Sequence, residues 1–223
     1  MTSHPRTEEP QDTTLILVRH GETVWNRDKR WQGQTNSPLT DLGREQGARV
    51  AKRLSSLQVS AIYSSDLGRA RETADLIAAP HGLPVVPRED LRERAYGLLE
   101  GKTDDEAARL GPFWLLAFQA DRIRSTPPGG EIHAELCERV VEALSEIADA
   151  HPGQTVVVAT HGGPIKCALY HILSIPLSLW RLTWIANGSI TIFRGTRDVL
   201  RVACVNDTCH LEAPALAPTE MED

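Results

Sequence analysis

The stretch TTLILVRHGET, residues 13–23, decides the fold of this chain. Its first six residues are apolar or β-branched, which is typical of a short strand that is covered on both faces. The run stops abruptly at Arg19, His20 and Gly21. Because open α/β folds bind their ligands at the carboxyl ends of sheet strands, the turn that follows this strand predicts a functional site.

The three residues of this turn have chemistry that suits an anion. Arg19 offers a planar fork of donors for a phosphate or a carboxylate. His20 can act as a nucleophile or a base near neutral pH. Gly21 permits a close backbone approach that a side chain would block. Taken alone, the motif is also compatible with an ordinary strand end that carries a solvated arginine and a structural histidine.

Length and composition favour one globular α/β domain. The chain has 223 residues, of which 41% are hydrophobic, enough for a sizeable core. It contains no apolar run of about 18 residues, so no membrane span or membrane partner is predicted. Residues 1–11 are polar and lack the apolar centre of a secretory signal. The formal net charge is -6 without any basic run, so we expect no nucleic-acid partner.

The four cysteines predict no disulfide framework at this length and density, which favours a reducing compartment and a cytoplasmic protein. Cys137 and Cys167 fall within helical patterns, and we expect both to be small core residues. Cys204, Cys209 and His210 are loosely spaced soft ligands that fit zinc spacing poorly, so no metal site is predicted.

Strands and helices alternate between two polar ends. We expect flexible tails over residues 1–12 and 212–223 and a single domain over residues 13–211. Apolar spacing predicts helices over 40–57, 65–79, 103–110, 131–150 and 164–173, and strands over 59–63, 155–160, 182–193 and 200–205. This alternation predicts an α/β fold, a three-layer α/β/α sandwich with a mainly parallel central sheet.

A second strand ends as the first one does. The run at residues 155–160 is followed directly by His161, Gly162 and Gly163. If both strands are central and parallel, His20 and His161 lie at the same edge of the sheet. Two imidazoles, several arginines and a carboxylate around one cleft suit phosphoryl transfer through a covalent phosphohistidine.

The ordered motifs of the chain resemble those of the histidine phosphatase superfamily, which includes the cofactor-dependent phosphoglycerate mutases. The first motif is RHGET at residues 19–23. Those that follow are WN at 25–26, QG at 32–33, SPLT at 37–40, SSDLGRA at 64–70, ETA at 72–74, ERAYG at 93–97, EG at 100–101, PGGE at 128–131, HGG at 161–163 and NGSI at 187–190. Each motif is short, but in this order they are specific and cover nearly the whole chain.

The resemblance implies a phosphoglycerate mutase-like fold and a role for each charged residue of the site. His20 is the nucleophile, and Arg19 and Arg69 hold the phosphate oxygens. His161 stabilises charge on the transferring phosphate. Glu93 is the acid that protonates the leaving alkoxide and then takes a proton from the attacking water.

Neutral groups complete the implied phosphate site, namely the amides of Asn26 and Gln32, the loop residue Gly33 and the backbone N–H of Gly162. The resemblance implies no metal and no other cofactor, because arginines and imidazoles neutralise the phosphate. It implies a small phosphorylated metabolite as the substrate, and it alone suggests a homodimer.

Several of these residues also have an ordinary structural interpretation. An arginine at the start of a helix, such as Arg69, is usually solvated, and RER at residues 92–94 reads as a solvated charge run. Glu89 and Glu100 are rival carboxylates for the acid role. Glu93 is preferred because YG and EG follow it at the family's spacing.

Other conspicuous side chains are given structural roles. We expect surface or capping positions for the remaining histidines outside the N-terminal tail, at residues 81, 133, 151, 171 and 210. The apolar residues of the segment 179–185 fit either a dimer edge or a core strand, and the core strand is favoured slightly. Ile132 stands where the family often has serine, and with Phe113, Trp114 and Phe118 it predicts a less polar substrate.

The chain is predicted to be a metal-independent phosphomonoester hydrolase of the histidine acid type. GGPI at 162–165, the short chain and EG at 100–101 favour this activity. ERAYG at 93–97 favours the alternative, a 2,3-bisphosphoglycerate-dependent phosphoglycerate mutase. A catalytically idle module that binds phosphorylated ligands is a third reading, which the full catalytic set disfavours. A nucleotide-binding oxidoreductase is disfavoured, because no GxGxxG follows the first strand.

Overall fold

The structure, a computed structural model, describes residues 11–211. Within this range one six-stranded sheet has the order β3-β2-β4-β1-β5-β6. The strands are β1 (Thr13–Arg19), β2 (Ala61–Ser65), β3 (Val85–Arg88), β4 (Thr155–Thr160), β5 (Ile190–Gly195) and β6 (Leu200–Asp207). The predicted tails lie outside the described residues, apart from positions 11 and 12.

The centre of the sheet is parallel. Strands β3, β2, β4 and β1 run in one direction, β5 pairs antiparallel with β1, and β6 pairs antiparallel with β5. Arg19 pairs with Thr160, and the His20 N–H donates to the Thr160 carbonyl at 3.0 Å. The prediction that both motif-bearing strands are central and parallel is therefore confirmed, and it puts His20 and His161 at one edge.

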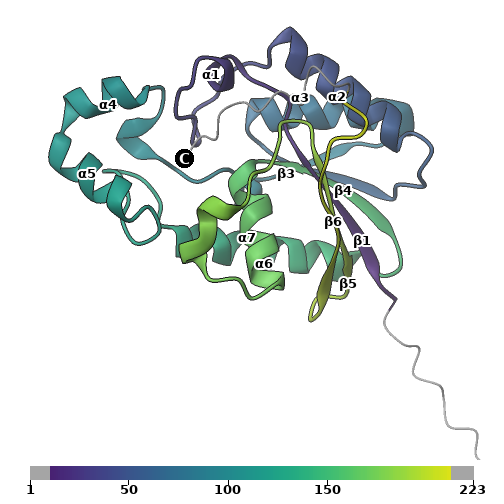
Figure 1. Cartoon of the computed structure of the whole chain (residues 1–223). Coiled ribbons are helices and arrows are strands. Elements are labelled where there is room, and N and C mark those ends of the chain that lie inside the picture. Colours follow the sequence, from purple (N-terminus) through teal and green to yellow (C-terminus); the bar gives the residue numbers. More distant parts are fainter. Residues whose placement is uncertain (1–10, 212–223) are drawn as a thin grey trace, which may run out of the picture.

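Helices cover both faces of the sheet (Figure 1). The helices α2 (Asp41–Leu54) and α3 (Gly68–Ala78) lie on one face, and α6 (His133–Ala150) and α7 (Gly162–Ile172) lie on the other. This is the predicted three-layer α/β/α sandwich.

The alternation of side chains in β1 explains its continuous apolar run. Leu15 and Leu17 pack into the core shared with α6 and α7, whereas Ile16 and Val18 pack into the core shared with α2 and α3. All four are essentially buried. A strand covered on both faces needs apolar side chains at every position, as the sequence predicted.

Three short helices lie near the carboxyl edge of the sheet: α1 (Val24–Arg27), α4 (Asp104–Leu110) and α5 (Pro112–Ala120). We call α4 and α5 the cap, because they project away from the sandwich (Figure 1). A small core of the cap contains Leu99, Ala107, Leu115 and Phe118. Spacing predicted α4, but it identified α5 only as an apolar patch.

The predicted element boundaries are mostly correct to within three residues. The Thr40 hydroxyl accepts a hydrogen bond from the Gly43 N–H at 3.0 Å, so Thr40 is the N-cap of α2. The strand predicted over 182–193 is wrong in its first half, since β5 begins only at Ile190. Before it lies a 3₁₀ helix, Leu177–Leu182, in which Leu182 is 76% exposed. The segment is therefore not a strand, although Ile185 is buried in the core and Trp180 packs against it.

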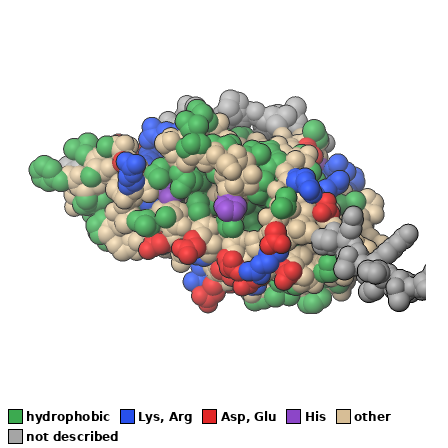
Figure 2. All heavy atoms as spheres, turned by 90° about the horizontal axis from the view of Figure 1, so that it is seen from below, with side chains coloured by type: hydrophobic (Ala, Val, Ile, Leu, Met, Phe, Trp, Pro, Cys, Tyr) green, Lys and Arg blue, Asp and Glu red, His purple; other side chains and the backbone are tan. Residues whose placement is uncertain are grey.

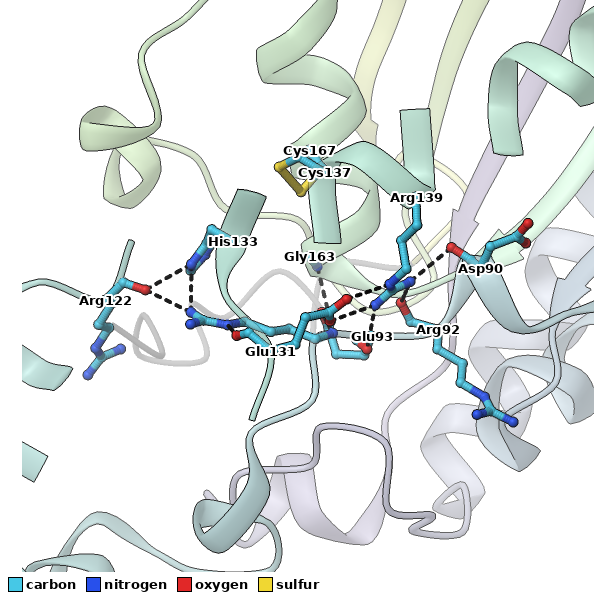
Figure 3. The surroundings of a disulfide bond; sticks show 11 residues. Asp90, Arg92, Glu93, Arg122, Glu131, His133, Cys137, Arg139, Gly163 and Cys167 are labelled. Atoms are coloured by element: carbon cyan, nitrogen blue, oxygen red, sulfur yellow. Dashed lines mark hydrogen bonds and ion pairs between the residues drawn. A yellow bond between two sulfur atoms is a disulfide. The ribbon is translucent and has the colours of Figure 1, made fainter. Parts of the chain in front are cut away.

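Cys137 and Cys167 form a disulfide that joins α6 to α7, with 4.9 Å between the Cα atoms (Figure 3). The expectation of unpaired cysteines is wrong for these two, because the packing of two helices brings together residues that are 30 positions apart. Cys167 is buried in the core, as predicted, and Cys137 packs against that core.

Acidic and basic side chains are interspersed on the underside of the molecule (Figure 2). The helix α6 contributes two surface ion pairs, Arg88 with Glu146 and Arg197 with Glu142. Among residues 11–211, no helix is both long enough and apolar enough to cross a bilayer.

Candidate active site

His20 lies directly after β1 and is 3% exposed. Its Nδ1 is 2.7 Å from the Gly21 carbonyl oxygen, so Nδ1–H donates and the lone pair remains on Nε2. Burial, followed by the charges of Arg69 and Arg19, holds the pKa of His20 well below its usual value. The ring is therefore neutral at neutral pH, with a lone pair on Nε2.

Gly21 is required by a close approach of two backbones. A Cβ at this position would lie 2.1 Å from the carbonyl oxygen of Gly43, which is in the first turn of α2. The sequence interpretation of Gly21 is thus supported, and the contact fixes the turn that presents His20.

His161 approaches His20 edge-on, with 5.1 Å between the ring centroids. Arg69 Nε donates to His161 Nδ1 at 3.2 Å, so Nε2 carries the hydrogen and faces Ser65 Oγ at 2.9 Å. Burial and the charge of Arg69 keep the pKa of His161 well below its usual value. Both ring nitrogens are engaged with protein groups, which orients the ring.

Arg69 is 1% exposed, so its interpretation as a solvated helix residue is wrong. Nη1 donates to the Thr35 carbonyl at 2.9 Å and Nη2 donates to the Gly33 carbonyl at 2.6 Å. Burial lowers the pKa of Arg69 to about 10, which leaves the guanidinium charged at neutral pH. Gly33 thus contributes its carbonyl oxygen to the site, where it accepts a hydrogen bond from Arg69.

Arg19 and Gly162 lie against each other across the two central strands. Arg19 Nη1 donates to the Ile185 carbonyl. A Cβ at Gly162 would lie 3.7–3.8 Å from the Arg19 side chain, in ordinary contact. The predicted cation and the predicted backbone donor are therefore adjacent.

The two predicted amides use their oxygens internally. Asn26 Oδ1 accepts from the Thr23 N–H at 3.1 Å, and Gln32 Oε1 accepts from the Thr23 hydroxyl at 2.8 Å. Asn187 Nδ2 donates to the His20 carbonyl at 3.1 Å and to Asn26 Oδ1 at 3.2 Å. Within the described part of the chain, no hydrogen bond is found for the NH₂ groups of Asn26 and Gln32. The structural role of Asn187 was not predicted, although its motif was recognised.

Glu93 faces the start of α7 (Figure 3). Its Oε2 accepts from the Gly163 N–H at 3.0 Å, and its Oε1 accepts from the Arg94 N–H at 2.8 Å. A Cβ at Gly163 would lie 2.0 Å from Glu93 Oε1. Gly163 therefore makes room for the carboxylate two residues after His161.

Arg139 on α6 fixes the backbone that carries Glu93 (Figure 3). It donates to the carbonyls of Asp90, Arg92 and Glu93 at 2.9, 2.7 and 3.0 Å. An ion pair with Glu131 at 2.7 Å holds the guanidinium in place. Sequence reasoning missed Arg139, because only the folded chain brings α6 beside this segment.

Arg94 is 1% exposed, so the charge-run interpretation of its segment is also wrong. It donates to the carbonyls of Arg122, Ser125 and Glu131, and its Nη1 lies 2.6 Å from His133 Nδ1. His133 is buried too, which contradicts its expected surface or capping position. Burial and the charge of Arg94 lower the pKa of His133 to about 3.

The rival carboxylates have other partners. Glu100 accepts from the backbone N–H groups of Gln34, Thr35 and Tyr96, so it organises the loop that holds Arg69. The Glu89 side chain is 80% exposed and faces Arg92. Of the three candidates, Glu93 is the carboxylate bound to the α7 N-terminus beside His161.

The aromatic residues do not support a less polar substrate. Phe118 is 1% exposed and belongs to the core of the cap, and Phe113 is 88% exposed. Within residues 11–211, no three His, Cys, Asp or Glu side chains are grouped so that they could hold a metal ion.

The chain belongs to the histidine phosphatase superfamily (branch 1), whose pattern it matches over residues 15–208. Among curated proteins it is 41% identical to phosphoglycerate mutase-like protein 4 of Arabidopsis thaliana, over 92% of this chain and 90% of that protein. It is 36% identical to a probable phosphoglycerate mutase, GpmB, of Escherichia coli, over 91% of this chain and 96% of that protein.

Solved structures of the family have the same fold. YhfR of Bacillus stearothermophilus superposes with a TM-score of 0.84 at 38% identity, covering 90% of this chain and all of that one. The mycobacterial glucosyl-3-phosphoglycerate phosphatase Rv2419c superposes with a TM-score of 0.77 at 30% identity, covering 87% of this chain and 99% of that one. The family prediction is confirmed, and similar structures include phosphatases.

Proposed function

We propose that this protein is a metal-independent phosphomonoester hydrolase that works through a phosphohistidine on His20. One observation carries the proposal: a neutral imidazole with its lone pair on Nε2 lies close enough to the charged guanidinium groups of Arg69 and Arg19 to be acted on by both charges. An uncharged nucleophile beside fixed cations suits attack on a phosphate dianion, because phosphoryl transfer depends mainly on positioning and charge stabilisation.

In the first step His20 Nε2 attacks phosphorus, and the bond from phosphorus to the ester oxygen breaks. The protonated carboxyl of Glu93 gives its proton to the departing alkoxide, which leaves as an alcohol. Arg19, Arg69 and the NH₂ groups of Asn26 and Gln32 hold the three remaining phosphate oxygens, with the Gly162 N–H as a further donor.

In the second step water replaces the alcohol. The Glu93 carboxylate accepts a proton from the water, whose oxygen attacks phosphorus while the P–N bond breaks. His20 returns to its neutral form, and inorganic phosphate leaves. His161, oriented by Arg69 and Ser65, stabilises charge on the transferring group.

The names of similar solved structures support hydrolysis. They include phosphatases for glucosyl-3-phosphoglycerate and, at 25% identity, a putative one for α-ribazole-5'-phosphate. We accordingly propose a small phosphorylated metabolite as the substrate. The cytoplasmic location stays a prediction from the overall cysteine usage, and the Cys137–Cys167 bond weighs against a reducing compartment.

A phosphoglycerate mutase is the second candidate, because two curated relatives carry that name. A mutase retains its phosphohistidine against water and returns the phosphoryl group to a bound acceptor. An idle binding module is the third, and it requires that His20 have no chemical role.

Phosphorus NMR distinguishes these functions. The metal-free enzyme is given 3-phosphoglycerate, a trace of 2,3-bisphosphoglycerate and p-nitrophenyl phosphate together. We expect inorganic phosphate to accumulate without 2-phosphoglycerate. Rapid formation of 2-phosphoglycerate with little free phosphate would instead show a mutase, and no turnover of any ester would favour the binding module.

The covalent intermediate has its own test. Alkaline quenching of the enzyme during turnover should trap an acid-labile phosphoryl group on His20. His20→Asn should lose this label together with at least about 1,000-fold in kcat. His171→Asn, a change on the exposed side of α7, is the matched control and should keep both.

A further inference from the structure

Lys166 is a charged side chain near the reacting groups that the proposed chemistry does not use. It lies on α7, three residues after Gly163 and four after Gly162. Residues three and four apart share one face of a helix. Because Gly163 contacts Glu93 and Gly162 lies against Arg19, this face of α7 is turned toward the proposed acid and one of the phosphate-binding cations.

Within residues 11–211 the ammonium group of Lys166 makes no ion pair, although the charge of the Glu93 carboxylate acts on it favourably. Its Nζ makes a cation–π contact with the Trp180 ring, whose centroid lies 4.4 Å away. Both oxygens of Glu93 are bound elsewhere, to the N–H groups of Gly163 and Arg94. The side chain is only partly exposed, so it has lost part of its hydration without gaining a direct ion pair among the described residues.

The surroundings of Lys166 favour the binding of an anion. Burial lowers its pKa to about 8, with Arg19 acting in the same direction and Glu93 opposing it. An anion beside the ammonium would relieve this cost. The aromatic face of Trp180 keeps the ammonium in place meanwhile.

We propose that Lys166 recognises a second anionic group, such as a carboxylate, on the leaving alcohol of the substrate. The inference rests on the proposed hydrolase function, because Glu93 marks the side of the site where the alcohol leaves. Arg19 and Arg69 are assigned to the phosphate, so Lys166 is the cation available for the other end. The preferred substrates are then phosphomonoesters of hydroxy acids or other doubly anionic metabolites.

A matched pair of esters tests the proposal. 3-Phosphoglycerate and glycerol 3-phosphate share the phosphate and the adjoining carbons, but only the first carries a carboxylate. We expect the wild type to prefer 3-phosphoglycerate by about tenfold or more in kcat/KM. Lys166→Met should abolish most of this preference, and Lys166→Arg should retain it to within about threefold. Lys52→Met, which removes a charge on the exposed side of α2, should leave the ratio unchanged.

The competing explanation is that Lys166 only tunes Glu93. In that case Lys166→Met would slow both esters by the same factor, because both release an alkyl alcohol, and the proposal would be overturned. A wild type without preference for the carboxylated ester would overturn it as well.

Binding without turnover separates this inference from the hydrolase function. Calorimetric titration of His20→Ala with both esters should show tighter binding of 3-phosphoglycerate, and the added Lys166→Met change should remove the difference. If the wild type hydrolyses neither ester nor p-nitrophenyl phosphate, the hydrolase function fails, yet the titration still decides the role of Lys166. Equal affinities for the two esters would contradict the proposal.

Discussion

The position of single hydrogen atoms governs the chemistry of this site. The Gly21 carbonyl fixes the hydrogen of His20 on Nδ1, and Arg69 fixes that of His161 on Nε2. The carbonyl beside His20 accepts a hydrogen bond and the guanidinium beside His161 donates one, so the two histidines have different tautomers. The same dependence on single contacts holds for Glu93, whose place depends on the missing side chain of Gly163.

Gly163→Ala should displace the Glu93 carboxylate although Glu93 itself is unchanged. The added Cβ would meet Glu93 Oε1, so the carboxylate must move away from the α7 N-terminus. We expect kcat for glycerol 3-phosphate to fall about 100-fold. Turnover of p-nitrophenyl phosphate should fall much less, because its leaving group needs no proton.

The matched control for this change is Gly68→Ala. A Cβ there makes only ordinary contacts with Asn36, the nearest at 3.5 Å, so both activities should persist. Equal losses on both esters in Gly163→Ala would show that the glycine serves the fold rather than the acid.

His133 should make stability depend on pH. In the unfolded chain a histidine binds a proton below about pH 6.5, whereas folded His133 does so only near pH 3. Between these values the unfolded state binds more protons, so stability falls as the pH falls through this window. His133 alone should lower the free energy of unfolding by about 2 kcal/mol between pH 7 and pH 5.

Urea denaturation of the wild type and His133→Asn at both pH values measures this effect. The variant should be less sensitive to acid, and His171→Asn, on the exposed side of α7, should behave as the wild type does. The same pH dependence in all three proteins would mean that folded His133 binds its proton normally.

At the scale of elements, the site depends on how α6 and α7 are held beside the sheet. Arg139 on α6 binds three carbonyls of the segment that ends at Glu93, and the first turn of α7 binds the Glu93 carboxylate. The Cys137–Cys167 disulfide joins the same two helices. A shift of either helix would therefore move the acid relative to His20.

Loss of the disulfide should cost stability. Cys137→Ser opens a loop of 30 residues, and the entropy of that loop predicts a loss of about 3.6 kcal/mol in the free energy of unfolding. Cys204→Ser, at a free cysteine, should cost little. Alkylation of the unfolded protein without reductant should label Cys204 and Cys209 alone. Labelling of all four cysteines would contradict the bond.

At the scale of the whole molecule, the site joins segments from the entire length of the chain. His20, Arg69, Glu93 and His161 come from four separate parts of the sequence, and the loop that holds Arg69 is organised by Glu100. A ligand that bridges these groups binds only the folded state. Binding should therefore stabilise the whole domain.

Orthovanadate, an analogue of the transferring phosphate, should raise the melting temperature. At a concentration about 100-fold above its Kd, the expected gain is about 2.7 kcal/mol, or roughly 5–10 °C for a chain of this size. A chelator should leave this shift and the esterase activity unchanged, because the cations of the site are arginines. Arg69→Met should lose most of the shift. A shift that disappears with the chelator would show that a metal ion takes part.

The sequence by itself determined the fold class, the two central strands and the set of candidate site residues. Apolar periodicity depends on residues that are close together in the sequence. The motifs contain the candidate site residues in their order along the chain. Only the tertiary structure decided that Arg94 and His133 are buried, that Arg139 holds Glu93, that Cys137 meets Cys167 and that Lys166 is partly buried without an ion pair among the described residues. These facts depend on contacts between segments far apart in the chain. Burial decides whether a charged side chain keeps its hydration, and burial follows from those contacts.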